Sequence, residues 1–176
     1  MNALLADVVR LWARPAEMGD IAETGSTLLE NAVIKASAVV AFAHADALAD
    51  DTGLEVDALD GAPGVRSARF AGDPPNDARN RALLLERLVG VTNRSARFCT
   101  VLAIVRVDGT IVHAKGICEG TIAESERGNN GFGYDAVFIP RDGDGRTFAE
   151  LSSAEKNLMS HRARAVFALR ELLPTP

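Results

Sequence analysis

The sequence predicts an α/β fold, a single domain in which a central mixed, twisted sheet is flanked by helices. Segments with apolar residues at helical spacing alternate along the chain with short segments of β-forming residues. Of the 176 residues, 47% are hydrophobic, which is enough to bury one substantial core. Neither an internal repeat nor a low-complexity linker divides the chain, so we expect residues 1–176 to form one domain.

Charge and hydropathy exclude several kinds of partner. The formal net charge is −5 and the sequence has no run of Lys or Arg, which argues against a nucleic-acid partner. No apolar segment reaches the roughly 20 residues needed to span a bilayer, and the N-terminal segment carries acid and Arg in place of a signal-peptide pattern. We therefore expect a cytoplasmic protein with no membrane partner.

The first part of the chain predicts two helices and two strands. Apolar residues at helical spacing predict a helix over residues 2–12. A second helix follows Ser26 or Thr27, either of which can cap it. Its expected apolar face consists of Leu29, Val33, Ala36, Val40 and Phe42. Residues 47–50 and 54–59 predict two short strands on either side of an acidic pair.

A hairpin is predicted near the middle of the chain. Residues 96–107 and 110–119 read as strands that flank Asp108-Gly109, a dipeptide that favours a two-residue type I′ turn. Counting outward from such a turn places Cys99 opposite Cys118, at a separation compatible with a disulfide. The expected cytosolic setting favours two small buried thiols instead.

The remaining elements are predicted from glycine positions, N-capping residues and the spacing of apolar residues. A helix is expected over residues 76–90, and the glycine-rich residues 128–140 should form a loop that leads into a short apolar strand. Residues 151–174 are expected to be helical, with Ser152 as the N-cap of a capping box and a break at Ser160.

The acidic pair Asp50-Asp51 is the first candidate for a functional site. It follows a predicted strand and precedes Gly53, and α/β proteins usually bind ligands at strand ends. Together with Glu23, the pair would form an oxygen-only cluster that suits Mg²⁺. Taken alone, the dipeptide favours the alternative of a solvated acidic turn, since acids are common in turns.

Basic and aromatic residues form two further candidate groups. Beside the start of a predicted helix stand Lys156, His161 and Arg162, a set that favours anions. On the glycine-rich loop, Phe132 and Tyr134 with neighbouring Asp135 could stack a base. The alternative is that these aromatic rings are buried in the core under the loop.

Four segments occur in the same order and similar spacing as in the inosine/xanthosine triphosphate pyrophosphatase family. They are ETGSTLLENAVIKA, ADDTGLEVDALDGAPGVRSARF, GFGYDAVF and AEKNLMSHRARA. The chain resembles this family over nearly its whole length. The resemblance implies an inosine triphosphatase-like fold, a homodimer, a Mg²⁺ cofactor and cleansing of the nucleotide pool. The implied reaction hydrolyses noncanonical purine nucleoside triphosphates (ITP, dITP, XTP) to the monophosphate and pyrophosphate.

The resemblance also implies roles for individual residues. Asp51 would be the general base that activates water, and Glu23 and Asp51 would hold the metal, with Asp50 in support. Lys35, together with Lys156, would stabilise charge on the phosphates. The implied substrate-binding residues are Thr52, Phe132, Gly133, Tyr134, Asp135, Lys156, His161 and Arg162. Donors from His161 and Arg162 would suit the 6-keto group of the base.

One departure from the family pattern concerns the start of the chain. The family opens with a strand and a Thr/Ser-x-Asn-x-x-Lys phosphate loop, and no such motif is present before the first predicted helix. We therefore expect a sheet whose first strand is missing and a chain that binds and hydrolyses nucleotide poorly. The alternative is a weak or inactive nucleotide-binding or partner subunit that associates through the exposed sheet edge.

Overall fold

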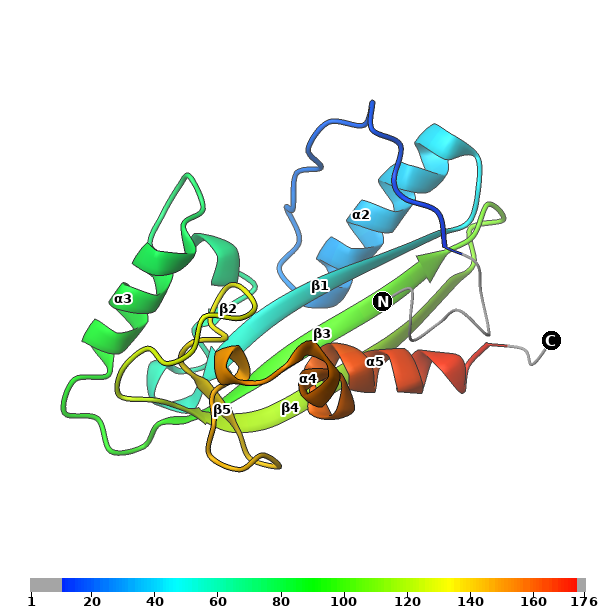
Figure 1. Cartoon of the computed structure of the whole chain (residues 1–176). Helices are drawn as coiled ribbons and strands as arrows, with labels where there is room; N and C mark the ends of the chain where they lie inside the picture. The colour runs from blue at the N-terminus through cyan, green and yellow to red at the C-terminus, as the bar shows by residue number, and fades with distance from the viewer. Residues whose placement is uncertain (1–10, 174–176) are drawn as a thin grey trace. The chain divides into compact units, whose positions relative to one another are not determined.

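The computed structural model describes residues 11–173 (Figure 1). Its contacts fall into two compact units. Within the described residues, unit 1 comprises 11–52, 100–116 and 162–173, and unit 2 comprises 53–99 and 117–161. The helix expected over residues 2–12 lies outside the described residues except for its last two positions, which have no regular secondary structure.

The strands form one five-stranded sheet with the order β2-β1-β3-β4-β5 (Figure 1). Their bounds are β1 Ala47–Val56, β2 Pro63–Gly64, β3 Ser95–Val105, β4 Ile111–Ile122 and β5 Phe138–Pro140. The α/β class is confirmed, but the expectation of a mixed sheet is corrected because the described strands run antiparallel. The β1–β2 and β3–β4 connections are too short to contain a crossover helix, so each turns the chain back on itself.

Strand β1 corrects the expectation of two short strands around the acidic pair. It runs without interruption through residues 47–56, so Asp50 and Asp51 lie inside the strand and not at its end. Gly53 is accommodated within the strand and is buried there. Because side chains alternate across a strand, the two adjacent carboxylates point to opposite faces of the sheet.

The β3–β4 hairpin is present, but its register differs from the expected one by one residue. Gly109 N donates to Arg106 O, and Arg106 N donates to Thr110 O, so the loop holds three residues with Gly109 in the left-handed region at φ 86°. At the far end, Ile122 N donates to Arg94 O in the same register.

This register separates the two cysteines. Counted from the pair Arg106 and Thr110, it places Cys99 opposite Ile117 and Cys118 opposite Phe98. The two cysteine side chains therefore lie on opposite faces of the sheet. The expected juxtaposition of Cys99 and Cys118 is therefore wrong. The expectation of buried thiols is confirmed, since both residues are buried and neither is in a disulfide.

Four helices are described. They are α2 Leu28–Ala43, α3 Asp77–Arg87, α4 Ser153–Met159 and α5 His161–Arg170. Thr27 and Ser152 each cap a helix within a complete capping box, and the expected break at Ser160 separates α4 from α5. The expected apolar face of α2 is only partly correct, because Phe42 is 51% exposed. Among the helices within residues 11–173, none has the length and apolar character needed to cross a bilayer.

In unit 1 the sheet is covered on both faces. Ala36 of α2 packs with Ala47 and Val105 on one face. The helix α5 packs against Leu102 and Ala114 on the other, through Ala165, Val166 and Leu169. Consecutive residues of β1 follow this division, since Ala49 joins the α2 face and Leu48 joins the α5 face. By the same alternation Asp51 faces α2 and Asp50 faces α5.

Unit 2 has its own core beneath the glycine-rich loop. Its buried members come from the strand ends, from α3 and the residue after it, from the glycine-rich loop and from the 3₁₀ turn before α4. They are Leu54, Val56, Leu84, Leu88, Ala96, Phe98, Cys118, Ile122, Tyr134, Val137, Phe138, Phe148 and Leu151. This packing places the loop that carries residues 128–137 on a rigid base.

Candidate functional site

The candidate residues lie in two groups, one in each unit. The carboxylate cluster, in unit 1, consists of Glu23, Lys35, Asp50, Asp51, Thr52 and Arg162. The glycine-loop cluster, in unit 2, consists of Phe132, Gly133, Tyr134, Asp135, Lys156 and His161.

Asp51 is the centre of the carboxylate cluster. The residue is 8% exposed, and its Oδ1 lies 2.7 Å from Lys35 Nζ. The same ammonium lies 3.2 Å from Glu23 Oε1, so Lys35 bridges the two carboxylates. Asn31 Nδ2 donates to the second oxygen of Asp51 at 3.3 Å. Each oxygen of this buried carboxylate therefore accepts a hydrogen bond from a side chain of α2, one from Lys35 and one from Asn31.

The electrostatics of this group follow from burial and pairing. Burial raises the pKa of Asp51, an effect that the hydrogen bond and charge of Lys35 oppose and the charge of Glu23 reinforces. The pKa of Lys35 is raised because the attraction of Asp51 and Glu23 outweighs the effect of its own burial. Asp51 thus holds a proton more readily than an ordinary Asp does, a property suited to a general base.

Asn31 is a residue of the site that sequence reasoning missed. It is 2% exposed, and its Oδ1 accepts a hydrogen bond of 2.8 Å from Gly25 N while its amide holds Asp51. A Cβ at Gly25 would lie 2.7 Å from that oxygen, so the close approach requires glycine. The signal in the sequence was the position of Asn31 four residues before Lys35, a spacing that puts both side chains on one face of a helix.

Asp50 and Thr52 lie on the other face of β1. Asp50 Oδ2 accepts hydrogen bonds from Arg162 Nη2 at 2.8 Å and Arg162 Nε at 3.1 Å. The hydroxyls of Thr52 and Thr100 are 2.7 Å apart. The structure therefore brings Asp50 together with Arg162 and separates it from the Glu23–Lys35–Asp51 group.

The donors of the carboxylate cluster suit a hard divalent cation to a limited extent. Within residues 11–173, no three His, Cys, Asp or Glu side chains gather closely enough to hold a metal ion. The pair Glu23 and Asp51 nevertheless presents two carboxylates to one cation, the ammonium of Lys35. Mg²⁺ is commonly bound through one or two carboxylates together with phosphates and water, so this pair fits the ion without Asp50.

Asp135 and Lys156 organise the glycine-loop cluster. Lys156 Nζ lies 2.6 Å from Asp135 Oδ2, and the backbone N of Phe132 donates to the same oxygen at 3.0 Å. The ammonium also lies over two rings, 5.5 Å from the Phe132 centroid and 5.0 Å from the Phe148 centroid. Asp135 is 4% exposed, and these donors from α4 and from the loop hold its carboxylate in place.

The aromatic residues of the loop have different environments. Tyr134 is buried in the core and donates through its hydroxyl to Ser67 O at 2.9 Å, and burial raises its pKa. Phe132 is 65% exposed. Of the two predicted stacking residues, only Phe132 presents a ring at the surface, while Tyr134 follows the alternative of an aromatic residue buried under the loop. His161 is buried too, stacked on Phe98 with ring centroids 4.5 Å apart.

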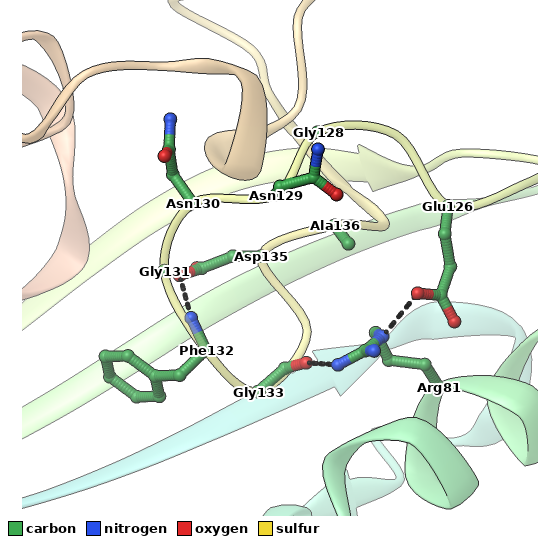
Figure 2. A pocket seen from close by; sticks show the side chains of 10 residues that line it. All are labelled: Arg81, Glu126, Gly128, Asn129, Asn130, Gly131, Phe132, Gly133, Asp135 and Ala136. Carbon is green, nitrogen blue, oxygen red and sulfur yellow. Dashed lines mark hydrogen bonds and ion pairs between the residues drawn. The ribbon is translucent and has the colours of Figure 1, made fainter.

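A cavity of about 220 Å³ lies along the glycine loop (Figure 2). Backbone and polar side chains dominate its wall. The lining residues are Arg81, Glu126, Gly128, Asn129, Asn130, Gly131, Phe132, Gly133, Asp135 and Ala136. Of these residues, sequence reasoning named Phe132, Gly133 and Asp135 as candidates and missed the rest, including Arg81 of α3 and Glu126.

The fold and these two clusters define an α/β protein with buried, paired charges and an exposed aromatic ring on a glycine loop. A model of the Ham1 family matches residues 1–172. The chain belongs to the Ham1 family, and the family resemblance found in the sequence is confirmed.

Three similar proteins illustrate this membership. The chain is 51% identical over 153 residues to a dITP/XTP pyrophosphatase of Exiguobacterium sp.. The aligned region covers 86% of this chain and 78% of that protein. A HAM1 protein from Coxiella burnetii has a solved structure similar to this one, with a TM-score of 0.86, 40% identity and coverage of 97% and 89%. A nucleoside-triphosphatase, dITP/XTP pyrophosphatase, from Mycobacterium abscessus gives a TM-score of 0.74, 44% identity and coverage of 90% and 80%.

Proposed function

We propose that the chain hydrolyses noncanonical purine nucleoside triphosphates, namely dITP, ITP and XTP, to the monophosphate and pyrophosphate. Such a reaction removes these nucleotides from the cellular pool. The observation that carries the proposal is that the ammonium of Lys35 bridges the carboxylates of Glu23 and Asp51 beside one face of β1. The names of the relatives support the substrate class.

In the proposed reaction, Asp51 accepts a proton from the attacking water. Asn31 holds the carboxylate in one orientation, and Lys35 lies beside its other oxygen. Lys35, whose ammonium is held in place by Glu23 and Asp51, would stabilise negative charge that develops on the phosphates. Lys156 supplies a second ammonium, held at Asp135.

We propose that Glu23 and Asp51 hold Mg²⁺. Asp50, which was expected to support the metal, lies on the opposite face of β1 and pairs with Arg162, so it is not part of this proposed site. The ion would neutralise triphosphate charge and lower the pKa of the attacking water. Through that ion the two carboxylates would orient the triphosphate, and Lys35, 2.7 Å from Asp51, would share in neutralising its charge.

We assign base recognition to the exposed ring of Phe132 and to the hydrogen-bond donors of His161 and Arg162. Phe132 offers a face for stacking, Gly133, Tyr134 and Asp135 shape the loop, and Thr52, His161 and Arg162 complete the proposed substrate contacts. A keto group at purine position 6 accepts hydrogen bonds from such donors, whereas the amino group of adenine does not. A mismatch leaves buried donors unsatisfied, so we expect strong discrimination against dATP.

The direct test is pyrophosphate release from dITP, XTP and dATP with Mg²⁺ present. Turnover of dITP and XTP with little turnover of dATP is expected. If the purified chain binds dITP but releases no pyrophosphate, the proposed hydrolysis is overturned in favour of a binding subunit.

The role of Asp51 is tested by Asp51→Asn, which keeps the shape and removes the base. We expect the rate to fall roughly a hundredfold or more, because a positioned general base contributes about 10²–10⁴-fold. Asp46→Asn is the matched control, since Asp46 is exposed and its Oδ1, which accepts from Val107 N, is retained in Asn. A rate unchanged by Asp51→Asn removes Asp51 from the mechanism.

We also propose a homodimer in the cytoplasm, supported by the family resemblance and by the expected absence of a membrane partner. Static light scattering on the purified chain measures the oligomeric state, and a monomer at all concentrations contradicts the proposal.

A further inference from the structure

Helix α3 holds the glycine loop through two side chains one helical turn apart. Gly133 N donates to Asp77 Oδ2 at 2.7 Å, and Arg81 Nη1 donates to Gly133 O at 2.8 Å. Arg81 Nε lies 2.9 Å from Glu126 Oε2, an ion pair that orients the guanidinium (Figure 2). The backbone N–H and C=O of Gly133 are thus both hydrogen-bonded to side chains of one helix.

Gly133 is a point at which the loop needs such support. Its backbone is in the left-handed region, with φ 60°, a conformation that glycine adopts without a steric penalty but that an unrestrained chain leaves readily. Fixing both its N–H and its C=O restricts the two peptide planes on either side. Those planes set the direction of Phe132 and of the segment leading to Asp135.

The neighbouring contacts show what the restraint controls. Phe132 carries the exposed ring of the loop, and its backbone N donates to the carboxylate of Asp135. That carboxylate in turn holds Lys156. Asp77 and Arg81 bind the backbone of Gly133, which lies between Phe132 and Asp135, so they can act on these side chains through Gly133.

We propose that Asp77 and Arg81 are positioning residues for substrate binding: they clamp Gly133 so that the loop bearing Phe132 and Asp135 is formed before the nucleotide arrives. The inference rests on the proposed function, in which this loop contacts the nucleoside. Without the clamp, ordering of the loop must occur during binding, and apparent affinity falls by the fraction of molecules with a formed loop. The chemical step at Asp51 is unaffected once the substrate is bound.

The test compares KM and kcat for dITP in variants that remove or retain each contact. Asp77→Ala and Arg81→Ala should raise KM about tenfold, as expected for loss of one hydrogen bond to a charged group, with kcat within about twofold of the parent. Asp77→Asn keeps an acceptor oxygen for Gly133 N and should stay within about threefold of the parent KM. Arg81→Lys keeps a single donor nitrogen and should be intermediate.

The matched control is Glu86→Ala, an exposed position on the same helix. It should leave KM and kcat unchanged. A double variant, Asp77→Ala with Arg81→Ala, should raise KM by less than the product of the two single effects, because both side chains hold the same residue. Independent effects that multiply in full would contradict a shared action through Gly133.

A second measurement separates the clamp from the reaction. Hydrogen exchange of the amides in residues 128–135, without nucleotide, should accelerate in Asp77→Ala and Arg81→Ala but not in Glu86→Ala. If the parent protein is active and both alanine variants keep the parental KM and loop exchange, the clamp is overturned. If the parent releases no pyrophosphate, the proposed function fails while loop exchange still reports on the clamp.

Discussion

Two adjacent acids have different partners because they belong to opposite faces of one strand. Asp51 faces α2 and is held by Lys35 and Asn31, whereas Asp50 faces the other side and is held by Arg162. The sequence predicted the importance of both acids but placed them at a strand end. It could not predict the partners, because the pairing of Asp50 with Arg162 joins residues 112 positions apart.

The pKa of Asp51 gives a prediction about stability in the metal-free protein. Burial raises this pKa above its ordinary value near 3.8, so the folded state binds the proton more tightly than the unfolded state. The contribution of Asp51 to the free energy of unfolding is therefore fully present below pH 3.8 and is lost as the pH rises through the raised pKa. Urea unfolding of the parent and of Asp51→Asn between pH 4 and pH 7 measures this difference.

The expected result is that Asp51→Asn gains stability relative to the parent as the pH rises through that window. The difference should then become constant once Asp51 is ionised in both states. A difference that shrinks as the pH rises would mean that the pairing with Lys35 outweighs burial and lowers the pKa of Asp51.

At the scale of elements, the capping residues in the sequence predicted the helix boundaries correctly, whereas the pairing register of the β3–β4 strands was predicted wrongly. Capping residues predicted the starts of α2 and α4 and the break at Ser160, because a cap depends on side chains within three or four residues. The β3–β4 register differed by one residue, because a three-residue loop with Gly109 in the left-handed region fits the same Asp-Gly signal as a two-residue turn.

The capping box of α2 gives a prediction for the helix that carries Asn31 and Lys35. Thr27 Oγ1 accepts from Glu30 N at 3.1 Å, and the carboxylate of Glu30 accepts from Thr27 N at 3.1 Å. Thr27→Ala should lower the free energy of unfolding by about 1 kcal/mol, since the first turn loses one acceptor. Thr27→Ser retains the hydroxyl and should cost far less in urea unfolding. Equal losses in the two variants would show that the Thr27 methyl group, and not the cap, stabilises the helix.

At the scale of the whole molecule, the single-domain expectation becomes a prediction about cooperativity. The contacts form two compact units, yet β1, β3 and β4 each contribute residues to both. A strand cannot lose its hydrogen-bonded partners in one half without releasing backbone groups at the junction with the other half. We therefore predict that the chain unfolds in one transition.

Pulsed hydrogen exchange across a urea series, read by mass spectrometry, tests this prediction with one peptide from each unit. Peptides covering α2, in unit 1, and α3, in unit 2, should become exchangeable at the same urea concentration. Thr27→Ala provides the sharper comparison, because its cap lies in unit 1. In a cooperative domain it lowers the midpoint of both peptides equally, whereas a shift confined to the α2 peptide would show that the two units unfold independently and that the single-domain prediction is wrong.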